Sequence, residues 1–401
     1  MKTLEDYRKI IGDDLVSELY RKARPLNGVR FLHINSTYYG GGVAEILNSL
    51  IPLLNDVGIE SDWRILRGSP DFFNTTKKFH NALQGEKINL SKNKIDTYIN
   101  ANSEFARYCR IDHDFVIIHD PQPLPLIKFY KKRQPFIWRC HIDLSNPNRD
   151  LFDYLKNFIF RYDVVVVSNE KFKQPDLPVE YKVIYPAIDP ATIKNIDLPN
   201  GSREKYLKKF FIPTDKPIIS QISRFDKWKD PEGVLEIFKM VKEKVDCRLI
   251  LCGSMATDDP EGIEIFEKVR KKAKKEMESG DVFLITMESN LFVNLIQRIS
   301  SVIIQKSLKE GFGLTVTEAL WKGTPVVASS VGGIKLQIKD GEHGFLVEPM
   351  DYKGFAEKIV YLLKNPNIAE EFSKKGKEFV KKNYLITRLL SDYINLLNEL
   401  K

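Results

Sequence analysis

The sequence has few of the features that anchor a chain in a membrane or direct it out of the cell. No run of about 18 apolar residues occurs, so no membrane-spanning helix is expected. The first residues, MKTLEDYRKIIGDD, mix charges of both signs and do not resemble a signal peptide. The sequence therefore predicts a cytoplasmic protein that does not act on a membrane.

Cysteine is also scarce, and the spacing of the cysteines is typical neither of zinc sites nor of disulfide-rich proteins. The four cysteines (Cys109, Cys140, Cys247 and Cys252) form no C-x-x-C pair and have no paired histidine spacing. Neither a zinc site nor a disulfide framework is indicated. We therefore expect the four cysteines to be buried free thiols. A D-x-D metal motif in a convincing loop is likewise absent, so we expect no tightly bound cofactor.

Charge is present in both signs, with a basic excess. The net charge of +8 comes from 62 basic and 54 acidic residues. The basic runs that begin at Lys271 and Lys374 lie on helical patterns with acidic residues between them, which is typical of solvated helix faces. A basic surface favours small anionic substrates, and we do not expect nucleic-acid binding.

The order of strand and helix patterns predicts an α/β protein with two domains. The chain of 401 residues, 43% hydrophobic, can bury two cores. Strands alternate with helices, and polar residues follow the strands, as in doubly wound parallel sheets. The Pro-rich segment 186–217 reads as a connection, after which the pattern restarts. We expect domains at 1–195 and 196–380, with a last helix in 381–401 crossing back to the first domain.

Two glycine-rich turns can accept an anion. Gly40–Gly42 follow an apolar strand and open into a helix. The pattern is neither G-x-x-x-x-G-K-[ST] nor a clean G-x-G-x-x-G, which disfavours a P-loop NTPase and a dinucleotide dehydrogenase; a mobile turn is the alternative. In the second, Gly311 and Gly313 allow close backbone approach, and a helix begins near Leu314.

Charged side chains accompany these turns. Glu310 and Glu318 flank the second turn and could accept hydroxyl groups, although a solvated loop charge and a helix-dipole effect explain them equally well. Arg224 and Lys229 precede a helix, where cations are unfavourable unless an anion is near. His141 and Asp143 follow a strand and could orient a sugar, or could be structural.

These residues carry a family resemblance. The segment EGFGLTVTE, from Glu310 to Glu318, resembles the E-x7-E motif of the retaining GT-B glycosyltransferases of family 4, and Arg224 with Lys229 resembles the family's R-x4-K pair. The resemblance implies a GT-B fold, in which two Rossmann-like domains face each other across a cleft. It also implies that the second domain holds a nucleotide sugar and the first domain the acceptor.

The resemblance assigns roles residue by residue. The implied catalytic residues are Glu310, Arg224, Lys229 and His141. The residues implied to bind the donor surround its diphosphate, its nucleotide and its sugar. They are Gly41, Gly42, Arg224, Lys229, Gly253, Ser254, Met287, Glu310, Gly313, Leu314, Thr315 and Glu318. The acceptor would lie against His141, Asp143, Asp120 and Gln122.

A narrower resemblance concerns the acceptor. The segments His119-Asp120-Pro121-Gln122 and WRCHIDLS are similar to those of the trehalose glycosyltransferring synthases. This implies a retaining transfer of glucose from UDP-glucose or ADP-glucose to free glucose. Another acceptor (a glycan, a phosphosugar or a lipid), an inverting mechanism, a phosphorylase and a non-catalytic nucleotide-sugar-binding protein stay open, as do a stimulating Mg²⁺ and a homodimer.

Overall fold

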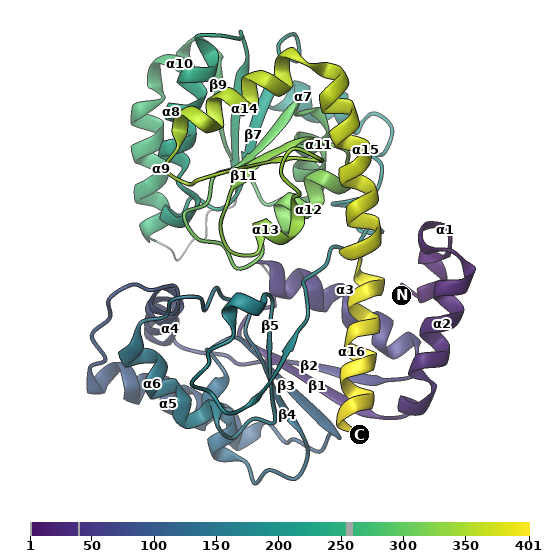
Figure 1. Ribbon diagram of the computed structural model, residues 1–401. Helices are drawn as coiled ribbons and strands as arrows, with labels where there is room; N and C mark the ends of the chain where they lie inside the picture. The colour runs from purple at the N-terminus through teal and green to yellow at the C-terminus, as the bar shows by residue number, and fades with distance from the viewer. Residues whose placement is uncertain (1, 39–40, 254–259) are drawn as a thin grey trace. The chain divides into compact units, whose positions relative to one another are not determined.

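The computed structural model describes residues 2–38, 41–253 and 260–401, and the predicted contacts at Gly40 and Ser254 lie outside these ranges. The chain forms two compact units. The first comprises Met1–Ala187 and Ile386–Lys401, and the second comprises Ile188–Leu385. Each unit contains a six-stranded sheet in which the strands pair in parallel, as Figure 1 shows. None of the helices in the described ranges is long and apolar enough to cross a membrane.

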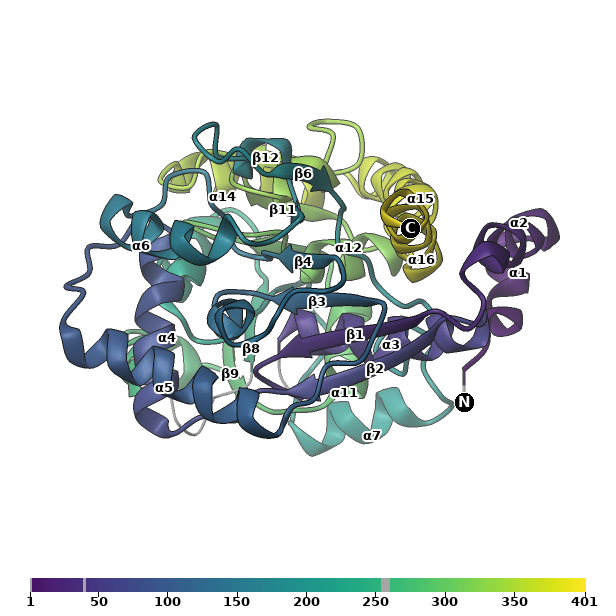
Figure 2. The same cartoon turned by 90° about the horizontal axis from the view of Figure 1, so that it is seen from below.

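The sheet of the first unit has the order β2-β1-β3-β4-β5-β6, and Figure 2 shows β2, β1, β3 and β4 side by side. Its strands are β1 (Arg30–Asn35), β2 (Glu60–Ile65), β3 (Phe115–His119), β4 (Phe136–Arg139), β5 (Val164–Val167) and β6 (Glu180–Val183). Its α-helices are α1 (Arg8–Ile11), α2 (Asp13–Ala23), α3 (Gly42–Asp56), α4 (Pro70–Leu83), α5 (Lys92–Tyr108), α6 (Arg149–Ile159) and α16 (Ile386–Leu400). Short 3-10 helices lie at Leu4–Tyr7, Arg24–Leu26, Leu124–Phe129 and Glu170–Phe172.

The two faces of this first sheet have different chemistry. On one face, Leu32, Ile34 and Ile118 pack with apolar side chains of α4, α5 and α6 in one buried cluster. On the other face, Phe31 and His33 lie against Tyr393 of α16. Strands buried on both faces are hydrophobic throughout, as Val164–Val167 are, so the histidine in β1 is an exception that needs a reason.

The sheet of the second unit has the order β12-β11-β10-β7-β8-β9. Its strands are β7 (Ile218–Ile222), β8 (Arg248–Gly253), β9 (Val282–Thr286), β10 (Val302–Gln305), β11 (Val326–Ser329) and β12 (Phe345–Val347). Its helices are α7 (Ser202–Lys209), the 3-10 helix Lys227–Lys229, α8 (Pro231–Lys242), α9 (Pro260–Lys272), α10 (Lys274–Glu278), α11 (Asn290–Ile299), α12 (Leu314–Trp321), α13 (Ile334–Gln337), α14 (Tyr352–Lys364) and α15 (Pro366–Asn383).

The unit boundaries lie a few residues from those expected after positions 195 and 380. They fall after Ala187 and after Leu385. The segment that begins at Ile188 belongs to the second unit because its side chains bind there. Asn195 Oδ1 accepts a hydrogen bond from Lys322 Nζ at 2.8 Å, and Ile188 N donates to the carbonyl of Tyr384 at 2.9 Å. The helix α16 packs within the first unit, against α2 and α3.

Candidate functional site

The strand order places two loops of the second unit together. The sheet runs from β7 through β8 to β9 in one direction and from β7 through β10 to β11 in the other. Loops that leave the carboxyl ends of two such central strands diverge and leave room for a ligand. The loop after β7 carries Arg224 and Lys229, and the loop after β10 carries Glu310.

The structure joins Lys229 and Glu310 in an ion pair. Lys229 Nζ donates to Glu310 Oε2, and Ser307 Oγ donates to the same oxygen at 3.2 Å. Both charged side chains are largely buried, with 19% of Lys229 and 12% of Glu310 exposed. Partial burial strengthens such a pair because water screens it less. Glu310 is therefore not a solvated loop charge.

One residue that sequence reasoning missed holds both loops in place. Gln221, in β7, donates through Nε2 to the carbonyl of Lys229 at 2.8 Å and accepts through Oε1 from the amide of Lys306 at 2.8 Å. A further bond joins Leu308 N to the carbonyl of Trp228 at 2.8 Å. The sequence signal was a pair of polar residues, Ser220 and Gln221, inside an apolar strand pattern.

A second feature that the sequence did not reveal is a buried ion pair that involves Asp230, the residue after Lys229. Lys306 is completely buried, and its ammonium group pairs with Asp230 Oδ2 and lies 4.6 Å from the centre of the Tyr352 ring. Asp230 caps α8 by accepting from Gly233 N at 3.0 Å and adopts a left-handed conformation with φ of 40°. A buried lysine needs such a partner, so Lys306 fixes the end of the loop that carries Lys229.

The helix α12 begins at Leu314, where the sequence predicted a helix start. Gly313 precedes it with φ of 87°, a conformation that favours glycine. No side chain within the described part of the chain caps this helix, whereas α4, α5, α6, α8, α11 and α14 each have a side-chain cap. The amides of Leu314 and Thr315 are thus the first-turn donors that an anion could bind.

Arg224 and Gly253 lie next to each other. Arg224 is half exposed, and its Nη2 is 3.5 Å from Asp226 Oδ2. A Cβ atom at Gly253 would lie 1.9 Å from the carbonyl oxygen of Ser223, so only glycine fits there. The amide of Met287 donates to the carbonyl of Gly253 at 3.1 Å. The predicted nucleotide contacts Gly253 and Met287 are therefore neighbours of the loop that carries Arg224.

Glu318 differs from its expected setting. Its side chain is 2% exposed and is enclosed by protein partners. Lys194 Nζ lies 2.8 Å from Oε1, and Gln297 Nε2 donates to Oε2 at 3.2 Å. Both oxygens thus already hold a protein donor, although a carboxylate has about four acceptor positions. The sequence could not reveal this, because Lys194 lies in the connecting segment, far from α12 in the chain.

The first unit brings the predicted acceptor residues to one edge of its own sheet. Its order reverses between β1 and β3. Asp120, directly after β3, has φ of 62° and accepts from the backbone amide of His141 through Oδ1 at 2.8 Å. Burial raises the pKa of Asp120 to about 6, while that amide and the charge of Arg139 oppose the increase. Asp120 and His141 are therefore physically linked.

The other two predicted acceptor residues have mainly local roles. Asp143 is 6% exposed and accepts from the amide of Ser145 at 2.9 Å. The side-chain oxygen of Gln122 is buried, and no hydrogen-bond partner lies near it within the described residues. Its backbone carbonyl accepts from Asn102 Nδ2 at 3.1 Å. An unpaired buried amide oxygen can receive a hydroxyl group from a ligand.

The glycine-rich turn of the first unit leads directly into α3. Gly41 has φ of 81°, α3 begins at Gly42, and no side chain of the described residues caps it. Like α12, α3 offers amide donors that a negative group could bind. In the described ranges, no group of three or more His, Cys, Asp or Glu side chains is arranged to hold a metal ion.

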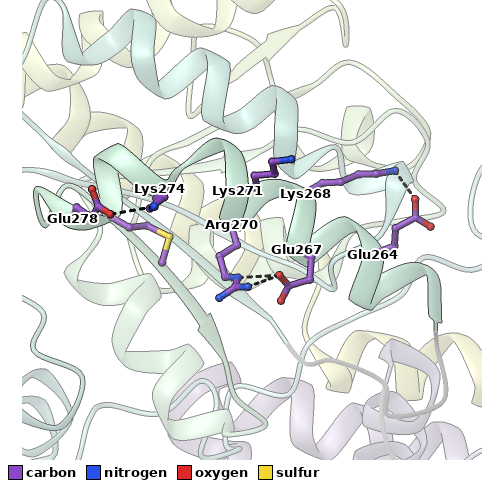
Figure 3. A pocket seen from close by; sticks show the side chains of 8 residues that line it. Glu264, Glu267, Lys268, Arg270, Lys271, Lys274 and Glu278 are labelled. Atoms are coloured by element: carbon purple, nitrogen blue, oxygen red, sulfur yellow. Dashed lines mark hydrogen bonds and ion pairs between the residues drawn. The ribbon is translucent and has the colours of Figure 1, made fainter.

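A separate charged hollow lies on α9 and α10. Its residues lie between the loop after β7 and the loop after β10 in the sequence and belong to neither. The hollow is lined mainly by acidic and basic side chains, and Figure 3 shows Lys268 with Glu264, Arg270 with Glu267 and Lys274 with Glu278 in pairs. These pairs are half exposed or more, so each contributes little stability. The surface is a solvated helix face.

Comparisons with known proteins agree with this architecture. Residues 33–174 match the family model "Trehalose synthase, N-terminal domain", and residues 202–379 match the model "Glycosyl transferases group 1". A solved structure from E. coli, trehalose-6-phosphate bound with UDP-2-fluoro glucose, superposes with a TM-score of 0.75 at 15% identity, covering 93% of this chain and 99% of that chain. Fold and family together define a glycosyl-transferring enzyme with the GT-B fold.

Full-length relatives narrow the family. The trehalose synthase of Pyrococcus horikoshii is 46% identical over 409 residues, which cover 100% of this chain and 97% of the relative. The chain therefore belongs to the family of the trehalose synthases. A trehalose phosphorylase of Pleurotus pulmonarius is 29% identical over 87% of this chain, but over only 54% of its own length.

Proposed function

We propose that the protein transfers glucose from UDP-glucose or ADP-glucose to free glucose, with retention of configuration, and so makes trehalose. The observation that carries the proposal is the ion pair of Lys229 and Glu310 beside the open N-terminus of α12. A nucleoside diphosphate needs cations and amide donors, and a hexose needs a carboxylate. That combination occurs at the switch point of the second sheet.

In this reaction, Arg224, Lys229 and the amides of Leu314 and Thr315 bind the diphosphate. Negative charge grows there as the sugar–phosphate bond breaks. Fixed donors aimed at a developing charge each contribute several kcal/mol, commonly about 3–4 kcal/mol when one is removed. Glu310, released from Lys229 by the incoming phosphate, would accept a hydroxyl group of the transferred glucose. Glu318 would contact the ribose beside Lys194.

His141 and Asp120 would bind the acceptor glucose. Their backbone-to-side-chain bond at 2.8 Å holds the two groups as one unit. The open amide end of α3, which follows Gly41 and begins at Gly42, would bind a negative group of the substrates. Asp143 and Gln122 would complete the acceptor site, Gln122 through its unpaired side-chain oxygen.

The test is an incubation of the protein with UDP-glucose or ADP-glucose and a panel of free sugars, glycans and sugar phosphates. We expect nucleoside diphosphate release that depends on glucose, and a non-reducing disaccharide whose new linkage keeps the configuration of the donor. A product formed only with another acceptor would reject the trehalose assignment. Binding of the nucleotide sugar without any product would identify a non-catalytic binding protein.

A second candidate is phosphorolysis of trehalose, which the similarity to the Pleurotus pulmonarius trehalose phosphorylase favours. The same cations would then hold inorganic phosphate in place of a diphosphate. Incubation with trehalose and phosphate, without nucleotide, separates the two reactions. Glucose phosphate formed at a rate above that of the nucleotide-dependent reaction would favour the phosphorylase.

A further inference from the structure

Three histidines form a diagonal row across the first sheet: His33 in β1, His119 in β3, and His141 two residues after the end of β4. His33 pairs in register with Ile117, and His119 pairs with Arg139. His119 and His141 therefore each lie one strand over and two residues further toward the carboxyl edge than the previous histidine. Side chains two residues apart point to the same face of a sheet. All three rings consequently share one face.

The rings are in hydrogen-bond contact along the whole row. His33 Nδ1 lies 3.2 Å from His119 Nε2, and His119 Nδ1 lies 3.1 Å from His141 Nε2. Successive rings are nearly parallel, with centroids 5.5 Å and 5.4 Å apart. His33 and His119 are completely or almost completely buried, and His141 is partly exposed. The row thus leads from the interior to the edge that carries Asp120.

The environment keeps the rings uncharged. Burial lowers the pKa of His33 to about 3 and lowers the pKa values of His119 and His141 well below 6.5, and the charge of Arg139 lowers the latter two further. Of the other titratable groups in the described residues, Asp120 accepts from the backbone amide of His141, Tyr393 of α16 lies against His33, and the charges of Asp392 and Arg388 act on Tyr393. A neutral imidazole has one N–H and one bare nitrogen. Each ring must therefore donate at one nitrogen and accept at the other.

The buried end of the row decides which way the hydrogen bonds point. Within the described residues, His33 Nε2 is buried and has no hydrogen-bond partner. A buried N–H group without an acceptor is rare in proteins, so this nitrogen is the bare one. The hydrogen of His33 is then on Nδ1 and is donated to His119. His119 in turn carries its hydrogen on Nδ1 and donates it to His141 Nε2.

We infer that His33 and His119 are positioning residues that lock His141 in the tautomer with its hydrogen on Nδ1, so that His141 presents a hydrogen-bond donor to a sugar oxygen. The inference rests on the proposed function for its substrate, but not for the tautomer. A donor at this position recognises a hydroxyl or ring oxygen as an acceptor and cannot remove a proton from the attacking hydroxyl group. His141 would then bind and orient the sugar, and it would not serve as a general base.

The tautomer can be measured without substrate. The chain has 6 histidines, so a two-bond ¹H–¹⁵N correlation spectrum of the ¹⁵N-histidine-labelled wild-type protein resolves each ring, with assignments from single substitutions. We expect protonated Nδ1 and bare Nε2 in His33, His119 and His141. Protonated Nε2 in His141, or an averaged signal from two tautomers, would overturn the inference. The tautomer is read from the wild-type protein, and the substituted proteins serve only to assign its signals.

Two substitutions test the linkage. His119→Phe keeps a stacked ring and removes both hydrogen bonds, and we expect the His141 signals to become a tautomer average with a pKa nearer 6.5. His119→Asn returns an amide donor near the Nδ1 position and should restore the single tautomer. Unchanged His141 signals in His119→Phe would overturn the inference. If that variant does not fold, His33→Phe serves, because it removes only the buried end and should again leave His141 averaged.

A matched control and a kinetic measurement complete the test. His113→Phe replaces another buried histidine of the first unit, one that binds Asp62 at 2.8 Å, and should leave the His141 signals unchanged. In His119→Phe, kcat/KM for the sugar acceptor should fall at neutral pH, because His141 then spends part of its time without a hydrogen on Nδ1, and it should recover in His119→Asn; an unchanged kcat/KM contradicts the inference. If the wild type transfers glucose to no sugar, the proposed function fails while the spectrum still decides the tautomer.

Discussion

At the scale of single residues, Lys229 offers the sharpest test of the donor site. Replacing Lys229 or Arg224 with alanine removes a cation from the growing charge on the diphosphate. Turnover should fall a hundredfold or more, because loss of one such donor commonly costs about 3–4 kcal/mol. The measurement is the rate of nucleoside diphosphate release from UDP-glucose or ADP-glucose with glucose present.

Lys274→Ala is the matched control for these two substitutions. Lys274 lies on α10 of the same unit, is 79% exposed and lies 3.9 Å from Glu278, so its loss should leave turnover unchanged. Near-normal turnover in both Lys229→Ala and Arg224→Ala would reject the diphosphate site. Equal losses in all three variants would point to a general effect of positive charge.

At the scale of single elements, the cap of α8 should matter far more than an ordinary cap. Asp230 caps α8 and also neutralises the fully buried Lys306. Asp351 caps α14 through the amide of Gly354 at 2.8 Å in an exposed position. Loss of a cap costs about 1 kcal/mol, whereas breaking a buried ion pair costs about 3–5 kcal/mol. Urea unfolding should therefore show a much larger loss for Asp230→Ala than for Asp351→Ala.

A similar loss in the two cap variants would show that Lys306 does not depend on Asp230. In that case the ammonium group would have found water or another partner. Asp230→Asn separates the two effects, because asparagine caps helices well but carries no charge. We expect its stability to lie close to that of Asp230→Ala.

The first sheet should make stability depend on pH. An unfolded histidine binds a proton near pH ~6.5, but the pKa of buried His33 is lowered to about 3. Below pH ~6.5 the unfolded chain thus binds more protons than the folded chain. The free energy of unfolding therefore decreases as the pH is lowered, by up to about 1.4 kcal/mol per pH unit for a fully buried ring. His119 and His141, whose pKa values are also lowered, act in the same direction.

Asp120 opposes this trend. Burial raises its pKa to about 6, so between pH ~4 and 6 the folded state keeps a proton that the unfolded chain releases, and this group stabilises the fold as pH falls. The histidines outnumber it, and unfolding by urea at pH 7, 6 and 5 should show a net loss toward acid. His33→Phe should show a smaller loss. Parallel pH dependences for wild type and variant would contradict the assignment.

The sequence predicted these elements well and their partners poorly. The helix start near Leu314, the apolar strand before Gly40–Gly42 and the helix after these glycines follow from local patterns, and the structure has all three. The contact of Lys194 with Glu318 and the row of three histidines depend on pairing between distant segments. Only the register of the sheet brings His33, His119 and His141 to one face, and a single sequence does not give that register.

At the scale of the whole molecule, the chain enters the second unit at Ile188 and leaves it at Leu385. The first unit is therefore completed only by the last segment, α16. Its buried side chains include Leu389, Leu390, Tyr393 and Leu397. Each buried apolar side chain contributes about 1.5–3 kcal/mol, so their sum is comparable to the ~5–15 kcal/mol stability of a domain.

A chain that ends at Leu385 should therefore keep the second unit folded and lose the first. We expect calorimetry to show one transition at the temperature of the isolated segment 188–385, and proteolysis to digest residues 1–187. Cooperative unfolding of the truncated chain in a single transition that includes both units would contradict this expectation. The alternating patterns predicted two doubly wound parallel sheets, but the six strands of each sheet and the role of α16 in completing the first unit needed the structure.

The pairing of Lys229 with Glu310 has a consequence for selectivity in a crowded solution. A phosphate or sulfate that binds a lysine with a counter-ion must displace that counter-ion. Its net gain is only the difference between the lysine–anion and lysine–carboxylate attractions, which is small. A ligand that also offers hydroxyl groups to the displaced carboxylate recovers the loss, so an activated sugar gains where a bare inorganic anion does not. An inorganic anion without hydroxyl groups must therefore compete with the Glu310 carboxylate for Lys229 and gains little by binding.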